Sequence, residues 1–441
     1  MNFISTRRLT SGSPASTLGL SAAIAAGLAP DGGLYVPESL PCFAAKDFNG
    51  CNALADVATK LLAPFFADDA LAVQLPAICT HAFAFPAPLR ALATPDDYAL
   101  ELFHGPTAAF KDFGAHFLAS CMQRLQRDGL RPLTILVATS GDTGAAVAAA
   151  FCNLSNFRVV ILYPDGRVSP RQAHQLGCFG ANVRALRVAG SFDDCQRLVK
   201  RALGDDVLRA EVPMSSANSI SLGRLLPQMA YYAQAALVHW RRFNVMRKSI
   251  FLNFIVPTGN LGNAVACILA RACGLPIGRI VLATNANRTL ADFFSGADYA
   301  ARASIATLAN AMDVGNPSNF ERLRWLYPDV AQLRDEFDVV AVEDEAIRDI
   351  IRARHASHGE VFCPHTATAV RVLETLRARG ESGPWAVVAT AHPAKFDSIV
   401  EPLIGTFIPV PPALADLLTR PSHAEPLAAD YGVMRARLSR D

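Results

Sequence analysis

Six short runs rich in valine, isoleucine and leucine recur between residues 133 and 390, and a loop and a helical pattern follow them. Apolar runs without polar alternation are typical of strands buried on both faces of a sheet. We therefore expect an α/β protein with parallel sheets covered by helices, in two sheet domains with a cleft between them. The predicted strands are LTILVAT (133–139), RVVILYP (158–164), NVRALRV (182–188), IFLNFIVP (250–257), GRIVLAT (278–284) and WAVVAT (385–390).

The first 95 residues follow a different pattern. Helix-like runs at 53–66 and 68–83 are broken by proline-rich connections such as YVPESLP. They predict a small, mostly helical N-terminal domain over residues 1–95, ahead of an α/β region over residues 96–441. A chain of 441 residues exceeds what one core usually supports, which agrees with more than one domain.

Charge and cysteine content exclude several classes of protein. The formal net charge of +2 provides no field to attract nucleic acid or an anionic membrane. The ten cysteines are scattered without a C-x-x-C pair, so we expect reduced thiols and no metal site. The N-terminus lacks the apolar core of a signal peptide, and LGLSAAIAAGLA is too short to span a bilayer. These features favour a cytoplasmic enzyme.

The segment HGPTAAFKDFG (104–114) places Lys111 between a phenylalanine and an aspartate, before an apolar stretch. Burying an ammonium group is costly unless the group is paired or deprotonated. The segment alone leaves two interpretations open: Lys111 is an ordinary surface charge, or it is a catalytic amine.

The segment VPTGNLGNAV (256–265) joins a predicted strand to an apolar helix. Gly259 and Gly262 permit a tight turn that exposes backbone N–H groups at a helix start, which is a typical cradle for phosphate. The alternative is a turn without a ligand. The segment has neither the lysine of a P-loop nor the G-x-G-x-x-G of a dinucleotide fold.

Three further segments place polar residues next to predicted strands or helices. In VATSGDTGAAVAAAF (137–151) and VVATAHPAKF (387–396), the polar residues either cap a helix or bind a ligand at the carboxyl end of a strand. In MSSANSISLGRLLPQ (214–228), the alternatives are substrate contacts or a cap with a surface arginine. The candidates are Ser140, Asp142, Thr143, Ser216, Asn218, Ser219, Arg224, Thr390 and His392, the last more often structural than catalytic.

Seven motifs, the five above and two further ones, resemble the threonine synthase family in this order along the chain: ELFHGPTAAFKDFG, ATSGDTGAA, SSANSISLGRLLPQ, VPTGNLGN, NPSNFERL, CPHTATA and ATAHPAKF. The opening STR and GLAPDGGLYVPESLP are also similar to that family, so the resemblance covers essentially the whole chain. It implies the fold-type II architecture of pyridoxal-phosphate enzymes, similar to the tryptophan synthase β subunit. The small sheet subdomain is then expected at about 115–205, inserted in the large one.

The resemblance implies a conversion of O-phospho-L-homoserine and water into L-threonine and phosphate, the last step of threonine biosynthesis, with pyridoxal 5'-phosphate as cofactor. It implies that Lys111 forms the Schiff base and serves as general base at Cα and then at Cβ. It assigns the cofactor phosphate to Gly259, Asn260, Leu261 and Asn263, and the pyridine nitrogen to Thr390. Substrate contacts are expected from Ser140, Asp142, Thr143, Ser216, Asn218 and Arg224.

Two alternatives remain open at this level. The same residues could serve another lyase of this fold, such as a phospho-lyase that stops at a 2-oxo acid. The fold could also have been kept as a non-catalytic binding module. We expect a small-molecule substrate and a monomer or homodimer, without nucleic acid or membrane as partner.

Overall fold

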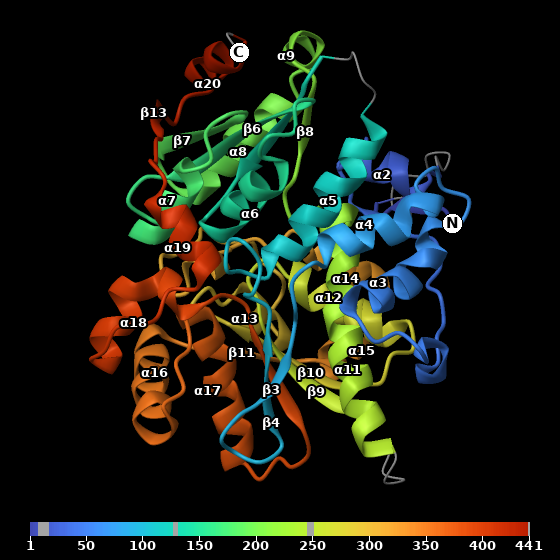
Figure 1. The fold of residues 1–441 in the computed structure, drawn as a ribbon, viewed down its shortest axis with the longest axis vertical. Coiled ribbons are helices and arrows are strands. Elements are labelled where there is room, and N and C mark those ends of the chain that lie inside the picture. The colour runs from blue at the N-terminus through green and yellow to red at the C-terminus, as the bar shows by residue number, and fades with distance from the viewer. Residues whose placement is uncertain (8–16, 127–130, 245–250, 440–441) are drawn as a thin grey trace.

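The computed structural model describes residues 1–7, 17–126, 131–244 and 251–439. Two sheets lie one above the other in Figure 1, and the helices of the N-terminal segment lie beside them at middle height. The lower, six-stranded sheet has the order β11-β10-β9-β12-β4-β3, and only β3 is antiparallel to its neighbour. Its strands are β3 (Leu89–Ala91), β4 (Asp97–Glu101), β9 (Leu252–Pro257), β10 (Ile277–Thr284), β11 (Asp338–Ala341) and β12 (Trp385–Ala389).

The upper, five-stranded sheet has the order β13-β7-β6-β5-β8 and is parallel throughout. Its strands are β5 (Leu133–Ala138), β6 (Phe157–Pro164), β7 (Val183–Ala189), β8 (Met214–Ser216) and β13 (Glu425–Ala428). A two-stranded ribbon near the N-terminus joins β1 (Phe3–Ser5) to β2 (Tyr35–Pro37). The upper sheet includes β8 and β13, which lie beyond the range 115–205 expected for it.

Helices cover the faces of both sheets. They are α2 (Leu20–Ala26), α3 (Leu54–Leu62), α4 (Leu75–Ala82), α5 (Lys111–Leu125), α6 (Asp142–Phe151), α7 (Pro170–Gly177), α8 (Phe192–Leu203), α9 (Asp206–Glu211), α10 (Leu222–Leu225), α11 (Met229–Asn244), α12 (Gly262–Ala272), α13 (Thr289–Phe294), α14 (Phe320–Leu326), α15 (Val330–Glu336), α16 (Asp344–His358), α17 (Pro364–Ala378), α18 (Asp397–Ile404), α19 (Pro412–Thr419) and α20 (Tyr431–Leu438). Short 3-10 turns include η4 (Leu226–Gln228) and η6 (Pro393–Phe396).

The predicted α/β class and all six predicted strands are confirmed, as β5, β6, β7, β9, β10 and β12. Residue 250 of the fourth predicted run lies outside the described residues, and β9 begins at Leu252. The strands β4, β8, β11 and β13 were not predicted. They are three to five residues long, and DYALE and EPLA carry charged residues that obscure an apolar run.

The N-terminal helices share one apolar core with residues of both sheets. Leu61 of α3 and Ile78 of α4 are buried in the same cluster as Phe117 of α5 and Tyr231 of α11. The predicted helices at 53–66 and 68–83 are present as α3 and α4 with short 3-10 turns beside them. The N-terminal segment therefore packs directly against the rest of the molecule.

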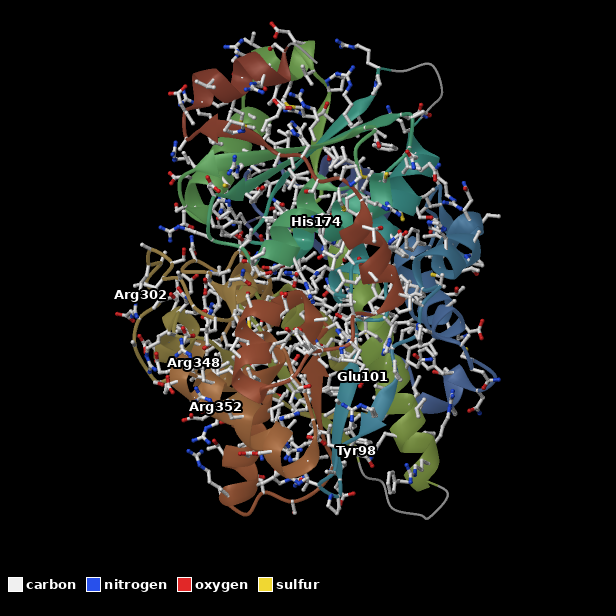
Figure 2. The ribbon with its side chains drawn as sticks, turned by 60° about the vertical axis from the view of Figure 1, so that its left-hand side comes forward. Tyr98, Glu101, His174, Arg302, Arg348 and Arg352 are labelled. Carbon is white, nitrogen blue, oxygen red and sulfur yellow. The ribbon has the colours of Figure 1, made fainter. Side chains whose placement is uncertain are left out.

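The surface carries charged side chains of ordinary kind. Arg348 and Arg352 point outward from α16, where both pair with Glu345, whereas His174 of α7 lies between the two halves and contacts the Leu417 carbonyl (Figure 2). All ten cysteines are free. Within the part of the chain that the structure describes, no helix is long and apolar enough to cross a membrane.

Candidate active site

Two motifs far apart in the sequence lie side by side at the lower sheet. The N–H of Phe110 donates to the Thr390 carbonyl at 2.8 Å, and the N–H of His392 donates to the Ala108 carbonyl at 3.0 Å. Thr390 directly follows β12, and Lys111 is the first residue of α5. These two bonds therefore bring the lysine and the threonine to the same edge of the sheet.

The aspartate next to Lys111 has a structural task. Oδ2 of Asp112 accepts from the Thr107 N–H at 2.9 Å, and Oδ1 accepts from the Thr107 hydroxyl at 2.6 Å. A Cβ on Gly105 would lie 2.5 Å from the same carboxylate, so a glycine is required there. Asp112 thus closes the loop before α5 and is engaged by Thr107 instead of Lys111.

Lys111 lies half-buried in the wall of a cavity of about 1120 Å³. Among the described residues it has no hydrogen-bond or ion-pair partner, and its ammonium lies 5.3 Å from the centre of the Phe110 ring. Burial lowers the pKa of Lys111 to about 8; Asp142 opposes this shift, and the charges on Arg224 and Lys395 add to it. A substantial fraction of the amine is therefore neutral near pH 8, and together with its place in the cavity lining this favours a catalytic amine over an ordinary surface charge.

The glycine-containing loop connects β9 to α12 along the same cavity. Leu261 has a φ of 61°, a left-handed conformation that turns the chain into the helix. A Cβ on Gly259 would lie 2.6 Å from the Met312 carbonyl oxygen, so this position accommodates only glycine without movement of the neighbouring backbone. The first N–H groups of an α-helix have no partner inside the helix, and those of α12 begin at this loop.

Two asparagines of the loop are held by neighbouring side chains. Asn260 donates to the Ser219 hydroxyl at 2.7 Å and accepts from the Ser318 N–H at 2.5 Å. Oδ1 of Asn263 accepts from the hydroxyls of Tyr231 and Tyr232 at 2.7 and 2.8 Å. The Nδ2 group of Asn263 is buried without a hydrogen-bond partner within the described residues, and Asn263 lines the cavity.

Ser140, Asp142 and Thr143, at the start of α6, do not cap the helix with their side chains. Gly141, with a φ of 138°, occupies the cap position, and no side-chain capping bond is present. The hydroxyl of Thr139 accepts from the N–H groups of Gly141 and Gly144 instead, both at 3.0 Å. Ser140 and Thr143 are thereby left to line the cavity.

Asp142 is held in a buried ion pair. Its Oδ1 lies 2.9 Å from Nζ of Lys395, and Nε2 of Gln172 donates to the same oxygen at 3.0 Å. Burial alone would raise the pKa of Asp142, but the charges on Lys395 and Lys111 outweigh it and hold the pKa well below its usual range. An ionised carboxylate repels another carboxylate, so Asp142 is poorly suited to touch a substrate carboxyl group directly.

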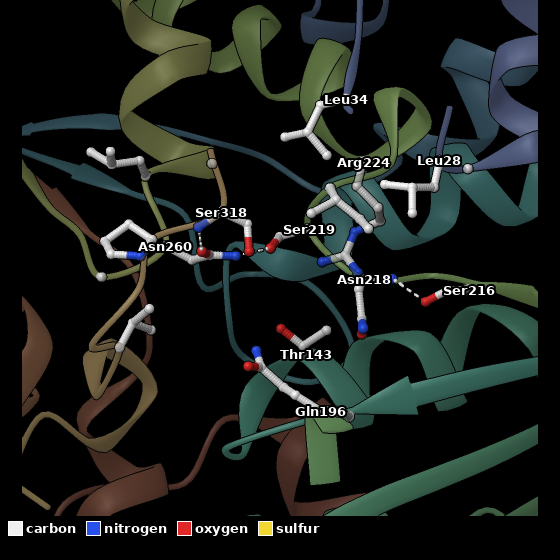
Figure 3. Close-up of a pocket in the computed structure, with 18 of the residues that line it drawn as sticks. Leu28, Leu34, Thr143, Gln196, Ser216, Asn218, Ser219, Arg224, Asn260 and Ser318 are labelled. Atoms are coloured by element: carbon white, nitrogen blue, oxygen red, sulfur yellow. Dashed lines mark hydrogen bonds between the residues drawn. The ribbon is translucent and has the colours of Figure 1, made fainter. Parts of the chain in front are cut away.

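Arg224 is buried, contrary to the alternative of a surface arginine. It is 2% exposed, one Nη donates to the Ala217 carbonyl at 2.7 Å, and its Nε has no partner among the described residues. Figure 3 shows its guanidinium pointing into the cavity near Asn218, with Thr143 and Gln196 on the opposite wall. A buried guanidinium that faces a cavity is a site for an anionic group.

The cavity brings together every residue of the predicted site. Its lining includes Lys111 and Thr390. It also includes the four residues of the β9–α12 loop and the six expected substrate contacts, which are Gly259, Asn260, Leu261, Asn263, Ser140, Asp142, Thr143, Ser216, Asn218 and Arg224. His392 does not line the cavity; its Nδ1 accepts from the Ala394 N–H at 3.2 Å, which is the structural role expected for it.

Other residues of the cavity were not predicted from sequence. Leu28 and Leu34 of the N-terminal segment form its apolar wall (Figure 3). His365, in the CPHTATA motif, is buried there; its Nε2 accepts from the Ala311 N–H at 3.0 Å, and burial lowers its pKa to about 4. Lys395, which is buried and lies outside the cavity lining, was also missed, although a lysine inside the apolar segment PAKF is a detectable signal.

The chemical groups in the cavity fit pyridoxal phosphate. A partly neutral lysine amine can hold an aldehyde carbon, and a helix start with the unpartnered amide donor of Asn263 can hold a phosphate. Thr390 provides a hydroxyl on the same wall, suited to a ring nitrogen. Nδ2 of Asn263 is thus a buried hydrogen-bond donor that has no partner within the described residues and is available to such a cofactor.

The sequence matches three family models. The model "Pyridoxal-phosphate dependent enzyme" matches residues 88–394, "Threonine synthase N terminus" matches residues 2–83, and "Threonine synthase, C-terminal" matches residues 366–437. Together they extend over nearly the whole chain.

Individual proteins are similar over the same extent. The threonine synthase of Serratia marcescens is 40% identical over 94% of this chain and 94% of its own length. The crystal structure of threonine synthase from Escherichia coli superimposes with a TM-score of 0.89 at 36% identity, covering 100% of both chains. The structure of PLP-bound threonine synthase from Brucella melitensis has a TM-score of 0.87 at 33% identity, covering 100% of this chain and 99% of that one.

Proposed function

The chain belongs to the threonine synthase family of pyridoxal-phosphate-dependent enzymes, and we propose that it carries out this reaction in the cavity around Lys111. It is a lyase that uses pyridoxal phosphate and acts at the last step of threonine biosynthesis. The reaction is the conversion of O-phospho-L-homoserine and water into L-threonine and phosphate. One observation carries the placement: Lys111, Asn263 and Thr390 converge in one cavity from three separate parts of the chain.

Three groups of this chain would hold the cofactor. Lys111 holds the aldehyde carbon through Nζ, because its lowered pKa leaves neutral amine available. The N–H groups at the start of α12 and Nδ2 of Asn263 would hold the phosphate, and the Thr390 hydroxyl would serve as partner of the pyridine nitrogen. When bound, pyridoxal phosphate supplies an electron sink that stabilises negative charge on the substrate carbons.

Lys111 also moves the protons of the reaction. With the substrate bound, Nζ would move one proton at a time: it would take the proton of Cα and give it up before it takes the proton of Cβ, and it would return a proton to Cγ once phosphate has left. The water that adds at Cβ needs the same base nearby. Because Lys111 starts α5 and its loop is fixed by the Thr107–Asp112 bonds, its backbone is held at a fixed place in the cavity wall.

The substrate is bound by the remaining polar groups of the cavity. Arg224 receives an anionic group of the substrate, and Ser216 and Asn218 orient it. Thr143 contributes a hydroxyl group from the opposite side, and Ser140 contributes another from the cavity lining. Asp142 contributes through its ion pair with Lys395, since its own charge would repel a carboxylate.

Further properties belong to the same proposal. The balanced charge supports a cytoplasmic enzyme that acts on a small molecule, as a monomer or homodimer without nucleic acid or membrane as partner. Residues 1–95 are proposed as the N-terminal domain and residues 96–441 as the catalytic region.

Product identification tests the function. Incubation of the purified protein with pyridoxal phosphate and O-phospho-L-homoserine is expected to give threonine and phosphate in equal amounts. Release of 2-oxobutyrate without threonine would instead support a phospho-lyase. The absence of any product, with the cofactor bound, would support a binding module.

Peptide mapping tests the site. Borohydride reduction of the loaded protein is expected to leave a pyridoxyl group on the peptide that contains Lys111. The variant Lys111→Ala should lack both this label and turnover, whereas Lys60→Ala, an exposed lysine of α3, should keep both. A label on another lysine would contradict the assignment.

A further inference from the structure

We infer that Lys395 is a positioning residue for Lys111: it holds the carboxylate of Asp142 and so keeps that negative charge from stabilising the Lys111 ammonium. This inference rests on the proposed role of Lys111 as the cofactor lysine. It adds a role that is separate from substrate contact, because Lys395 itself does not line the cavity.

The side chain of Lys395 is buried and held by two partners. Its side chain is fully buried, and Nζ lies 2.9 Å from Oδ1 of Asp142. The same Nζ donates to the Thr107 carbonyl at 2.7 Å. Thr107 belongs to the loop that ends at Lys111, so one ammonium fixes both the carboxylate and the backbone beside the catalytic amine.

The ion pair joins the two halves of the molecule. Asp142 starts α6 under the upper sheet, whereas Lys395 lies in η6 after the central strand of the lower sheet. Gln172 of α7 supports the pair by donating to Asp142 and accepting from Asn310 at 2.9 Å. Alignment of these groups therefore depends on both sheets.

A buried ion pair is weak evidence for a contribution to stability, because the desolvation of two charges offsets their attraction. An apolar pair of similar volume would pack the interior equally well. The position of this pair, beside the one amine that must lose its proton, gives it a function in the chemistry.

The charges that face Lys111 come from four elements. Asp142 of α6 is the anion, Arg224 of α10 and Lys395 of η6 are cations, and His365 of α17 is kept neutral by burial. The neighbouring Asp112 is engaged by Thr107. Without Lys395, Lys111 would be the remaining lysine whose charge acts on the carboxylate of Asp142, and a nearby opposite charge favours the protonated amine.

The test measures the reactivity of Lys111 as a function of pH in the full-length chain freed of cofactor. Trace acetic anhydride reacts only with neutral amines, and peptide mass spectrometry reports the rate at Lys111. In Lys395→Met the midpoint of this rate profile should move to higher pH by about one unit or more. In Asp142→Asn it should move to lower pH, and in the double variant it should return to within about half a unit of the original protein.

Opposite shifts separate this role from a structural one, because general loosening would move both single variants in the same direction. The control is Arg354→Met, which breaks the buried Arg354–Glu360 pair away from the cavity and should leave the Lys111 profile unchanged. If Lys395→Met does not fold, Asp142→Asn and the double variant still decide the matter through their difference. Profiles that coincide with that of the original protein would overturn the inference, whereas absence of a pyridoxyl label on Lys111 in the original protein would refute the proposed site itself.

Discussion

The hydroxyl of Tyr232 donates a hydrogen bond of 2.8 Å to Oδ1 of Asn263, a residue that lines the cavity, and this bond fixes the orientation of the amide. Nδ2 is thereby left as a donor without a hydrogen-bond partner in the described part of the chain. Asn263→Ala should weaken cofactor binding about tenfold or more, since a bond to a charged phosphate contributes roughly 1.5–3 kcal/mol. Fluorescence titration of the cofactor-free chain measures the dissociation constant.

Tyr232→Phe provides the matched comparison. Tyr231 still donates to the same oxygen, so this variant should weaken binding by only a few fold, on the order of 1 kcal/mol. Equal affinities of all three proteins for the cofactor would show that Asn263 does not contact it.

Two glycines of the same loop should respond differently to alanine. In Gly259→Ala the new Cβ would lie 2.6 Å from the carbonyl oxygen of Met312, and backbone cannot yield cheaply, so we expect a destabilisation of about 1–3 kcal/mol. In Gly262→Ala the nearest atom is Nδ2 of Asn319 at 3.5 Å, which is ordinary contact, so stability should be retained. Urea unfolding of the cofactor-free proteins measures this difference; similar losses in both variants would contradict the packing argument.

Arg224 should contribute to substrate binding more than to cofactor binding. Arg224→Gln removes the buried cation that faces the cavity and is expected to raise KM for the phosphorylated substrate at least about tenfold. Arg324→Gln is a useful comparison, because Arg324 lines the same cavity on α14. Steady-state kinetics measure the effect on substrate binding, and the cofactor affinity measures the effect on cofactor binding. An unchanged KM in Arg224→Gln would exclude a contact between Arg224 and the substrate.

His365 predicts a specific dependence of stability on pH. Burial lowers its pKa from 6.5 to about 4, so between these values the unfolded chain binds a proton that the folded chain does not. The free energy of unfolding must therefore fall as the pH falls from 6.5 to 4, by about 3 kcal/mol in total. Above pH 6.5 His365 is neutral in both states, and the full stability is present. Relative to His365→Gln, the original protein should lose free energy of unfolding across this window.

Urea titrations of both proteins at pH 7.5 and pH 4.5 measure this difference. The exposed His358 of α16 offers a control for the exchange itself, as His358→Gln. A difference between His365→Gln and the original protein that does not vary with pH would show that His365 titrates alike in the folded and unfolded chains.

The fold was predictable where burial on both faces leaves an uninterrupted apolar run. RVVILYP is β6 at the centre of the upper sheet, and WAVVA is β12 at the centre of the lower one. The strands that sequence did not reveal include β11 and β13 at sheet edges, where one side of the strand has no neighbour and polar residues are tolerated. Only the pairing with β10 or β7 shows that these segments are strands.

The candidate site was predictable from its motifs, but its charges were not. Lys111 and Asn263 belong to segments whose order along the chain resembles one family. The ion pair between Asp142 and Lys395 depends on two halves of the molecule meeting, and no local pattern encodes a contact between residues so far apart. The unpartnered Nδ2 of Asn263 likewise follows from two tyrosines on α11.

The order of the strands has a consequence for synthesis. β13, near the C-terminus, completes the edge of the upper sheet beside β7, and β12 inserts between β9 and β4. A nascent chain leaves the ribosome from its N-terminus, so the middle of one sheet and the border of the other stay open until translation is nearly finished. A chain that stalls before residue 385 thus exposes unpaired strand edges in both halves, and chaperones would have to shield these until the last segment emerges.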